Sequence, residues 1–310
     1  MVRAVTRKNL VSIMIPTYNR SIMFEQALLS ALSQDYKHIE IIVCDNSTND
    51  ETEQLIKKYL ADKRLTYIRN REAKTKAENF MPFENLAHGE YLQWLMDDDM
   101  LHPAKLTKMV NVLKKNSEVA LVSSQRQVID KDGHIVAWYP ADFPVKEEYS
   151  IYPSEFIAWK MLRNAANIIG EPSATLFRRK DLRHHYWQAE CKGYRTISDV
   201  VMWLELLEKG SLAIFRDALS FFRRHEEQEG QGIDVVILSR IEWYEINKEY
   251  FEGKVFPYTE DDYKNFLSVM VEEYKKKMYV YKEAATSAVW QRYMAMIESA
   301  ARVTGAATEG

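Results

Sequence analysis

The sequence predicts an α/β fold in which a mostly parallel central sheet is flanked by helices and is followed by a helical C-terminal extension. Two observations support this prediction. Through the first hundred or so residues, short apolar runs alternate with amphipathic helical patterns, which is typical of right-handed βαβ units around a parallel sheet. Beyond Glu226, about 80 residues follow with helical periodicity, many Tyr, Lys and Glu residues, and a break at Pro257.

The first part of the chain predicts four strands separated by helices. Strands are expected at residues 10–15, 39–44, 65–68 and 91–96, and helices at residues 21–33, 51–60 and 75–87. Ser21 is expected to be the N-cap of the first helix, because serine is among the residues preferred there. The apolar run at 39–44 is typical of a strand that is buried on both faces of a parallel sheet.

The next part predicts a more mixed arrangement. A helix is expected from Pro103 to Lys115, a strand at 119–122, a β-hairpin at 127–136, a loop at 138–152, a helix at 198–209, and short strands at 212–215 and 219–223. The Asp132-Gly133 pair predicts the turn of the hairpin. Gly210 is expected to be the C′ residue that ends the second of these helices.

Composition narrows the class of protein. Of 310 residues, 46% are hydrophobic and 28% are charged, as in a globular chain. The net charge of −3 argues against an obligate nucleic-acid binder. Two cysteines, Cys44 and Cys191, cannot form a disulfide framework, which favours a reducing cytoplasm. The sequence contains no apolar stretch long enough for a transmembrane helix, and residues 1–9 lack a signal core. We therefore expect a cytoplasmic location that allows peripheral contact with the inner face of the membrane.

Polar residues follow the first four predicted strands. Ligands of an open parallel sheet bind outside the carboxyl ends of its strands, so the segments at those ends are the candidate site: residues 16–20, 45–47, 70–71 and 97–99. None of them is a Gly-rich phosphate loop, which argues against a dinucleotide or P-loop site.

Three consecutive aspartates, Asp97, Asp98 and Asp99, directly follow the fourth strand. Carboxylates held this close together need a cation to remain ionised, and oxygen ligands suit Mg²⁺ or Mn²⁺. The alternative is an exposed acidic turn that caps the helix after Pro103. The residues alone leave both interpretations open.

Two further residues have a functional and a structural interpretation. Asp199 stands at the start of the predicted helix at 198–209, where a carboxylate is commonly a cap or a partner of the helix dipole. His225 follows two arginines and is by itself more typical of a surface residue, although histidine is also the commonest metal ligand.

Taken together, these residues resemble the inverting glycosyltransferases of family 2, which have the Rossmann-like, A-type nucleotide-sugar-binding fold. The resemblance covers about residues 10–225. It rests on five segments in the family's order: VSIMIPTYN at 11–19, IIVCDNSTNDET at 41–52, HGEY at 88–91 leading into the aspartates, GEPSATLFRR at 170–179, and the segment 198–210 with Ser198-Asp199, Trp203-Leu204 and LEKG.

The resemblance implies a role for each candidate residue. Thr17 and Tyr18, within the segment Pro16 to Asn19, would line the base and ribose, and Asp45 would accept a hydrogen bond from the base. The three aspartates take the place of the family's D-x-D motif, with Asp97 assigned to donor binding. The remaining implied assignments are Asp98 as the direct metal ligand with Asp99 as the alternative, His225 completing the metal or diphosphate site, Asp199 as the general base, and Arg71 or Lys76 in place of an arginine that helps to hold the base.

The implied activity is metal-dependent, inverting transfer of a sugar from a nucleotide diphosphate-sugar, with a UDP-sugar preferred, in bacterial cell-surface polysaccharide or glycoconjugate synthesis. Mn²⁺ or Mg²⁺ is the expected cofactor, and a glycan, a lipid-linked molecule or a protein is the expected acceptor. Residues 1–115 would form the donor half, 116–230 the acceptor and catalytic half, and 231–310 the extension. Two alternatives are a non-catalytic sugar-nucleotide-binding relative and a nucleotidyltransferase.

Two expectations concern regions outside the motifs. The C-terminal helices are expected to pack as a core or to form a homo-oligomer interface, in preference to lying on a membrane surface. The stretch 226–232, which contains Gly230 and Gly232, is expected to be a mobile loop that closes over the donor.

Overall fold

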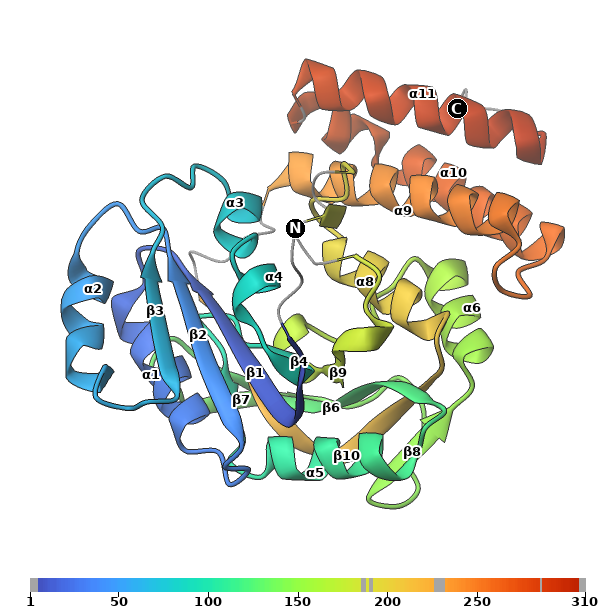
Figure 1. The fold of residues 1–310 in the computed structure, drawn as a ribbon. Helices are drawn as coiled ribbons and strands as arrows, with labels where there is room; N and C mark the ends of the chain where they lie inside the picture. The colour runs from blue at the N-terminus through green and yellow to red at the C-terminus, as the bar shows by residue number, and fades with distance from the viewer. Residues whose placement is uncertain (1–4, 185–187, 190–191, 226–231, 285, 307–310) are drawn as a thin grey trace.

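The computed structural model describes residues 5–184, 188–189, 192–225, 232–284 and 286–306. A single ten-stranded sheet forms the centre of the molecule (Figure 1). Its strands are β1 (Arg7–Thr17), β2 (Ile39–Asp45), β3 (Leu65–Arg69), β4 (Gly89–Trp94), β5 (Met100–Leu101), β6 (Val119–Ile129), β7 (Ile135–Tyr139), β8 (Tyr149–Tyr152), β9 (Leu176–Arg178) and β10 (Ser211–Arg223). The α-helices are α1 (Ser21–Leu32), α2 (Glu51–Ile56), α3 (Lys76–Phe80), α4 (Phe83–Leu86), α5 (Lys105–Lys115), α6 (Ser154–Asn164), α8 (Ser198–Leu207), α9 (Ile233–Gly253), α10 (Glu260–Ala284) and α11 (Ser287–Thr304).

The main path of the sheet runs in the order β3-β2-β1-β4-β9-β6-β10-β5. The first four strands on this path are parallel to one another. Beyond them, β9 is antiparallel to both β4 and β6, while β6 and β10 are parallel. The α/β fold is therefore confirmed, and its antiparallel pairs lie in the second half of the sheet. The parallel register places Thr17 beside Asp45 and Asp45 beside Arg69, so these strand ends meet at one edge.

Helices cover both faces of the sheet. Phe24 of α1, Ile56 of α2 and Met109 of α5 belong to one apolar core with Val11 and Ile13 of β1. The helices α3, α4, α6 and α8 contribute to a second core, which also contains residues of α9, α10 and α11. Successive side chains of a strand point to opposite faces, and Met14 of β1 accordingly belongs to this second core.

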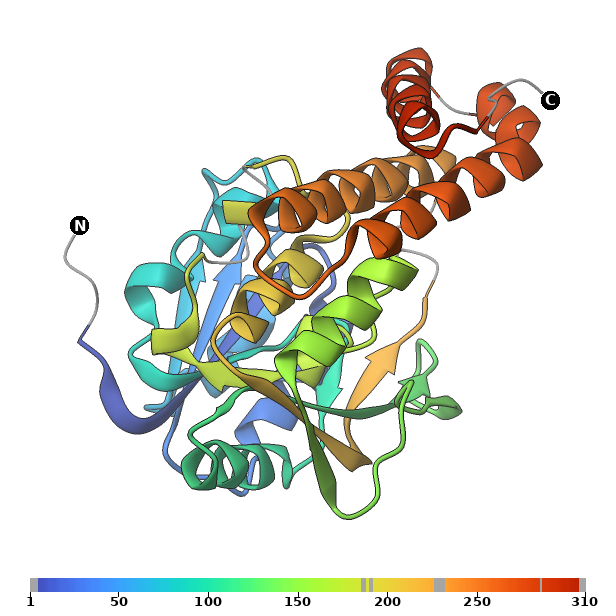
Figure 2. The ribbon, with the colours of Figure 1, turned by 90° about the vertical axis from the view of Figure 1, so that its right-hand side faces the viewer.

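The C-terminal extension is helical, as predicted, and Pro257 lies between α9 and α10. The three helices pack on one another and lie beside α6 and α8, away from α1, α2 and α5 (Figures 1 and 2). Within the described part of the chain, no helix is both long enough and apolar enough to cross a bilayer. The expected mobile loop falls largely on residues 226–231, which lie outside the described residues, as does Cys191. Cys44 is buried.

Ser21 is not the N-cap that the sequence predicts. Arg20 occupies the N-cap position of α1, and none of the described side chains caps this helix. The Ser21 hydroxyl instead donates a hydrogen bond of 3.1 Å to Glu51 at the start of α2. The serine thus joins two helices at the edge of the sheet where the candidate site lies.

Two other local expectations differ from the structure. The single helix expected at 75–87 is divided into α3 and α4, because Pro82 lacks the N–H that a continuous helix would use; Thr75 and Glu78 form a capping box at the start of α3. Gly210 does not have the left-handed conformation of a C′ residue. A Cβ there would lie 2.2 Å from the carbonyl oxygen of Glu118, so close approach of two backbones requires this glycine.

Two more segments contain more β-structure than expected. The predicted strands at 212–215 and 219–223 are one strand, β10, with register shifts between Phe215 and Ser220. The loop expected at 138–152 begins and ends in β-structure, because β7 extends to Tyr139 and β8 begins at Tyr149. The β6–β7 hairpin is confirmed, and Gly133 in its turn has a φ of 95°.

Candidate active site

A cleft of about 790 Å³ opens at the carboxyl ends of β1, β2 and β4. This volume lies within the usual range for small-molecule sites. Eight of the predicted site residues line it: Pro16, Thr17, Tyr18, Arg71, Lys76, Asp97, Asp98 and Asp99. Four others, Asn19, Asp45, Asp199 and His225, are not among its lining residues. The parallel sheet thus brings most of the predicted donor segments together at one edge.

Arg20, which also lines the cleft, pairs with two of the three aspartates. Its Nη1 lies 3.1 Å from Asp97 Oδ1 and 2.8 Å from Asp98 Oδ2. The backbone N–H of Tyr18 donates a hydrogen bond of 3.2 Å to Asp97. The segment after β1 and the loop after β4 are therefore joined directly.

The three carboxyl groups have different proton affinities. Burial and the charge of Asp98 raise the pKa of Asp97 to about 7, although Arg20 acts in the opposite direction. The same two causes raise the pKa of Asp99 well above its usual value. Burial also disfavours ionisation of Asp98, but a hydrogen bond with His225 and the charge of Arg20 prevail and lower its pKa. Asp98 is therefore the most acidic carboxyl group of the loop.

His225 lies beside Asp98, as the resemblance implies. Its Nε2 is 3.1 Å from Asp98 Oδ2, and only 3% of its side chain is exposed. Its Nδ1 is buried and has no hydrogen-bond partner among the described residues. A carboxylate and an imidazole are ligand types that divalent cations accept, so Asp98 and His225 are a candidate pair for holding one.

Arg223 holds the acidic loop in place from β10. Its backbone N–H donates to Asp99 Oδ1 at 3.1 Å, and its Nε donates to the carbonyl oxygen of Asp98 at 2.7 Å. Its Nη1 donates to the carbonyl oxygens of Asp130 and Lys131 in the hairpin turn, at 2.9 and 3.0 Å. This arginine is fully buried, and it links the acidic loop to the hairpin.

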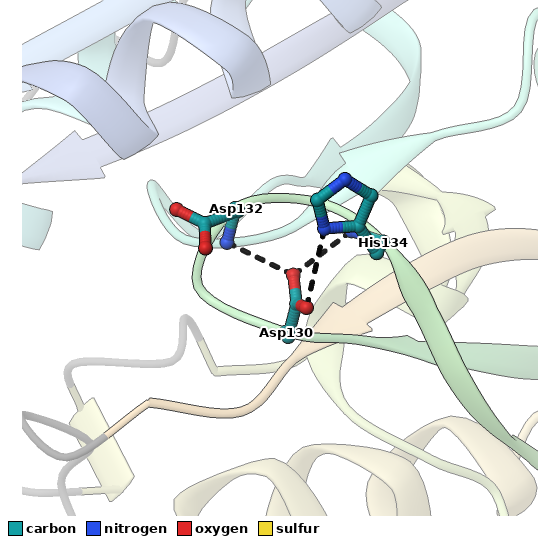
Figure 3. A group of neighbouring side chains, drawn as sticks. All are labelled: Asp130, Asp132 and His134. Atoms are coloured by element: carbon teal, nitrogen blue, oxygen red, sulfur yellow. Dashed lines mark hydrogen bonds and ion pairs between the residues drawn. The ribbon is translucent and has the colours of Figure 1, made fainter.

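A second acidic group lies in that hairpin turn (Figure 3). The ligand atoms of Asp130, Asp132 and His134 lie within 4.8 Å of one another, and no other group of three does so in the described part of the chain. Asp130 Oδ1 accepts hydrogen bonds of 2.9 Å from the backbone N–H groups of both Asp132 and His134. These contacts shape the turn, as an Asp side chain commonly does.

Asp45 is fully buried at the end of β2. Its carboxylate accepts hydrogen bonds from Tyr67 at 2.7 Å, from Arg69 at 2.5 Å and from the backbone of Ser47 at 2.8 Å. Arg69 also donates to the carbonyl oxygens of Ser47 and Asn49. The Asp45 carboxylate therefore shapes the loop under the cleft, and its contact with a base stays a prediction.

Arg71 and Lys76, the two candidates for holding the base, line the cleft in different ways. Arg71 is exposed and pairs with Asp50 at 3.0 Å and with Glu53 at 2.9 Å. The Lys76 ammonium lies 5.9 Å from the ring centre of Phe80.

Asp199 lies in the first turn of α8, two residues after the N-cap Ile197. Its Oδ1 accepts a hydrogen bond of 2.8 Å from Val200 N–H, and its Oδ2 accepts one of 2.7 Å from Asn167 Nδ2. Burial raises the pKa of Asp199 to about 6, the charge of Glu171 acts in the same direction, and Lys76 opposes it. Glu171 and Lys76 both line the cleft, so Asp199 lies within electrostatic range of it.

Several residues of the site were given no role from the sequence. Arg20 lay within the candidate segment 16–20 without an assigned role, and Arg69 ends β3, so the rule that locates ligands at strand ends could have indicated it. Asn167 orients Asp199 while its own Oδ1 accepts hydrogen bonds from Ile169 and Gly170. No sequence pattern indicated Asn167 or Arg223, because their roles depend on partners that are distant along the chain.

Comparison with known proteins gives a consistent result. The sequence profile of glycosyl transferase family 2 matches residues 12–185. An uncharacterized glycosyltransferase of Rickettsia typhi is 33% identical over 152 residues, which cover 48% of this chain and 47% of the relative. The Escherichia coli protein WfaP, described as a UDP-Glc:alpha-D-GlcNAc-diphosphoundecaprenol beta-1,3-glucosyltransferase, is 35% identical over 123 residues, or 40% of this chain and 48% of WfaP. The chain thus spans about half the length of these relatives.

Solved structures show the same fold. Residues 1–349 of Staphylococcus aureus TarS, in complex with UDP-GlcNAc, superpose with a TM-score of 0.62 at 13% identity, covering 95% of this chain and 81% of TarS 1–349. The complex of the same TarS fragment with UDP gives a TM-score of 0.61. The profile match covers more than half of the chain, and the strand-end motifs occupy one edge of the sheet. The chain therefore belongs to glycosyl transferase family 2.

Proposed function

We propose that this glycosyltransferase moves a sugar from a UDP-sugar to an acceptor hydroxyl with inversion, in a reaction that depends on Mn²⁺ or Mg²⁺. The observation that carries the proposal is that the Asp97–Asp99 loop lines a cleft at the strand ends, with His225 packed against Asp98 behind it. The UDP donor is supported by the printed description of WfaP and by the UDP-sugar complex of TarS. A glycan, a lipid-linked molecule or a protein would accept the sugar, in the synthesis of a bacterial surface polysaccharide or glycoconjugate.

In this proposal Asp98 and His225 would hold the cation, with Asp99 as the alternative carboxylate. The cation would stabilise the negative charge that develops on the leaving diphosphate. Asp97 would keep the loop against Tyr18 and Arg20, and Arg223 would hold it against β10. Thr17, Tyr18 and the neighbouring backbone would contact the nucleoside.

Asp199 would act as the general base. It would accept the proton of the acceptor hydroxyl as that hydroxyl attacks the anomeric carbon opposite the leaving diphosphate. A base positioned in this way contributes about 10²–10⁴-fold to the rate. Asn167 and the backbone of Val200 orient the carboxylate, and its raised pKa makes it a better proton acceptor than an ordinary aspartate.

The proposed division of labour follows the lining of the cleft. Most lining residues come from positions 16–99, while Glu171, Pro172 and Phe222 come from the second half. We therefore assign donor binding to residues 1–115, and acceptor binding and catalysis to residues 116–230. A cytoplasmic location with contact at the inner face of the membrane fits a lipid-linked acceptor.

A donor screen tests the proposal. Purified protein is incubated with nucleotide diphosphate-sugars, with and without Mn²⁺, and release of nucleoside diphosphate is measured. We expect UDP to be released from a UDP-sugar only when the cation is present, and this release to be lost in Asp98→Asn. The exposed hairpin variant Asp132→Asn is the matched control and should retain the release. Release of pyrophosphate would instead support a nucleotidyltransferase. Turnover that is unchanged in Asp199→Asn would contradict the proposed base.

A further inference from the structure

The C-terminal extension contacts the polypeptide just before α8 through one buried carboxylate. Glu242, in α9, is only 2% exposed. Its oxygens accept hydrogen bonds from the backbone N–H groups of Arg195 at 3.0 Å, Thr196 at 2.8 Å and Ile197 at 3.1 Å, and from the hydroxyl of Thr196 at 2.8 Å. Four donors from three consecutive residues thus converge on one side chain.

These contacts supply what the local sequence lacks. The N-cap of α8 is Ile197, whose side chain cannot accept a hydrogen bond, and no side chain in the described part of the chain caps the helix. Backbone N–H groups in a buried position need partners, and hydrogen bonds to an ionised carboxylate are among the stronger ones. Glu242 therefore determines the path by which the chain enters α8.

The same helix α9 also contacts α8 at its other end. Tyr250, which is 4% exposed, donates a hydrogen bond of 3.0 Å to Glu208, the C-cap residue of α8. Tyr194 donates one of 3.1 Å to Glu249. The two helices belong to one apolar core and lie side by side (Figures 1 and 2). Helix α9 thus holds α8 at both ends.

Asp199 is two residues beyond Ile197, the last residue that Glu242 contacts. A change in the entry to α8 would rotate or shift the first turn, and with it the carboxylate. A displacement of about 1 Å at a reacting group can lower a rate by about 10²-fold. The contact at Glu242 is therefore close enough to Asp199 to control its position.

We propose that Glu242 is a positioning residue, through which the C-terminal extension holds Asp199 in its reactive orientation toward the acceptor. This inference rests on the role of Asp199 in the proposed function. It assigns to the extension a part in sugar transfer, in addition to its contribution to the core. Within the described residues, the hydrogen bonds of Glu242 go to residues 195–197, none of which lines the cleft, so it would act through α8 and leave donor binding to other residues.

The first test is Glu242→Gln, which keeps the size of the side chain but places an amide NH₂ against backbone donors. We expect kcat to fall at least tenfold, while the KM for the donor and the Kd for UDP with Mn²⁺ change less than twofold. Amide hydrogen exchange at residues 195–197 should become faster. The matched control is Tyr258→Phe, which removes a buried hydrogen bond of 2.9 Å to Asn247 within the same extension. We expect this control to lower the melting temperature and to leave kcat within twofold.

A double-mutant cycle separates this inference from the proposed function. If Glu242 acts through Asp199, then Glu242→Gln should not reduce the residual turnover of Asp199→Asn any further. Losses that multiply in the double variant would overturn the inference, as would a kcat within twofold of wild type in Glu242→Gln. Asp199→Asn alone tests the base. If Glu242→Gln does not fold, the test uses Thr196→Val, which removes one of the four donors. This variant should lower kcat severalfold and leave the KM for the donor unchanged. An unchanged kcat would overturn the inference.

Discussion

The raised pKa of Asp199 predicts a specific pH dependence of sugar transfer. An ordinary aspartate has a pKa of about 3.9, whereas burial raises the pKa of Asp199 to about 6. A general base must be deprotonated to act, so activity should be fully present above pH 7 and should be lost as the pH falls through 6. At pH 5, one unit below the pKa, about one tenth of the molecules carry the ionised base, so kcat/KM should fall about tenfold. An aspartate with the ordinary pKa would remain more than nine-tenths ionised at that pH.

The assay is nucleoside diphosphate release between pH 5 and pH 8, with donor varied and Mn²⁺ saturating. Saturating cation is needed because Asp97 has a pKa of about 7 in the protein without a cation, and its titration would otherwise contribute to the profile. The acidic limb should therefore stay in place when the Mn²⁺ concentration is doubled. Asn167→Ala removes a hydrogen bond to the ionised carboxylate, so it should move the limb to higher pH.

Two results would refute this reasoning. One is a kcat/KM at pH 5 within twofold of its value at pH 7.5, because Asp199 would then have an unshifted pKa or no role as a base. The other is an acidic limb near pH 6 that persists in the residual activity of Asp199→Asn. The second result would assign the limb to a different group. We expect Asp199→Asn to lose about 10²–10⁴-fold in kcat and to bind UDP normally.

Three further predictions follow from the structure. In differential scanning fluorimetry, Mn²⁺ with UDP should raise the melting temperature of the wild type and of Asp132→Asn but not of Asp98→Asn, because only Asp98→Asn removes a ligand of the proposed cation site. An equal rise in Asp98→Asn would exclude Asp98 as that ligand. Gly210→Ala should lower the free energy of unfolding by about 1–3 kcal/mol in urea titrations, because the new Cβ would overlap a neighbouring carbonyl oxygen at 2.2 Å. In the control Gly253→Ala, the new Cβ would lie 3.4 Å from its nearest contact, so the free energy of unfolding should change by less than about 0.5 kcal/mol. Equal losses in the two variants would contradict the overlap. Burial and the neighbouring Asp45 raise the pKa of Cys44 to about 12. Iodoacetamide at pH 8 should therefore label this thiol only after denaturation, as measured by peptide mass spectrometry. Rapid labelling of the native protein would contradict the burial of Cys44.

The features that could be predicted from the sequence are those that local patterns determine. The alternation of apolar runs and helical patterns predicted the strands β1 to β4, and their parallel order placed the segments after them at one edge. Asp97, Asp98 and Asp99 were identified as candidate ligands because they directly follow a buried strand. The hairpin at Asp132-Gly133 was predicted because its turn requires particular residues. In each of these cases the physical cause lies within a few residues of its effect.

The features that could not be predicted depend on contacts between distant residues. Arg223 and Glu242 have ordinary sequence surroundings, and their importance comes from backbone groups 45 or more residues away. The contact of Asp45 with a base stays a prediction, whereas its hydrogen bonds from Tyr67 and Arg69 of the adjacent strand could not be predicted from the sequence. Gly210 was predicted to end a helix, although the backbone of a neighbouring strand is what requires it. Charged and backbone groups find such partners only when the tertiary structure is complete.

The contact between Arg223 and the acidic loop has a consequence for biosynthesis. The arginine and the loop carbonyl that it binds are 125 residues apart, and His225 lies 127 residues from Asp98. Chains emerge from the ribosome N-terminus first, at about 5–20 residues per second, so the aspartates leave the exit tunnel many seconds before Arg223 and His225. During that interval the parallel strands β1 to β4 can pair, but the contacts of Arg223 and His225 with the acidic loop cannot form. In the proposed function, the cation site would therefore be completed only late in translation, when nearly three quarters of the chain has been made.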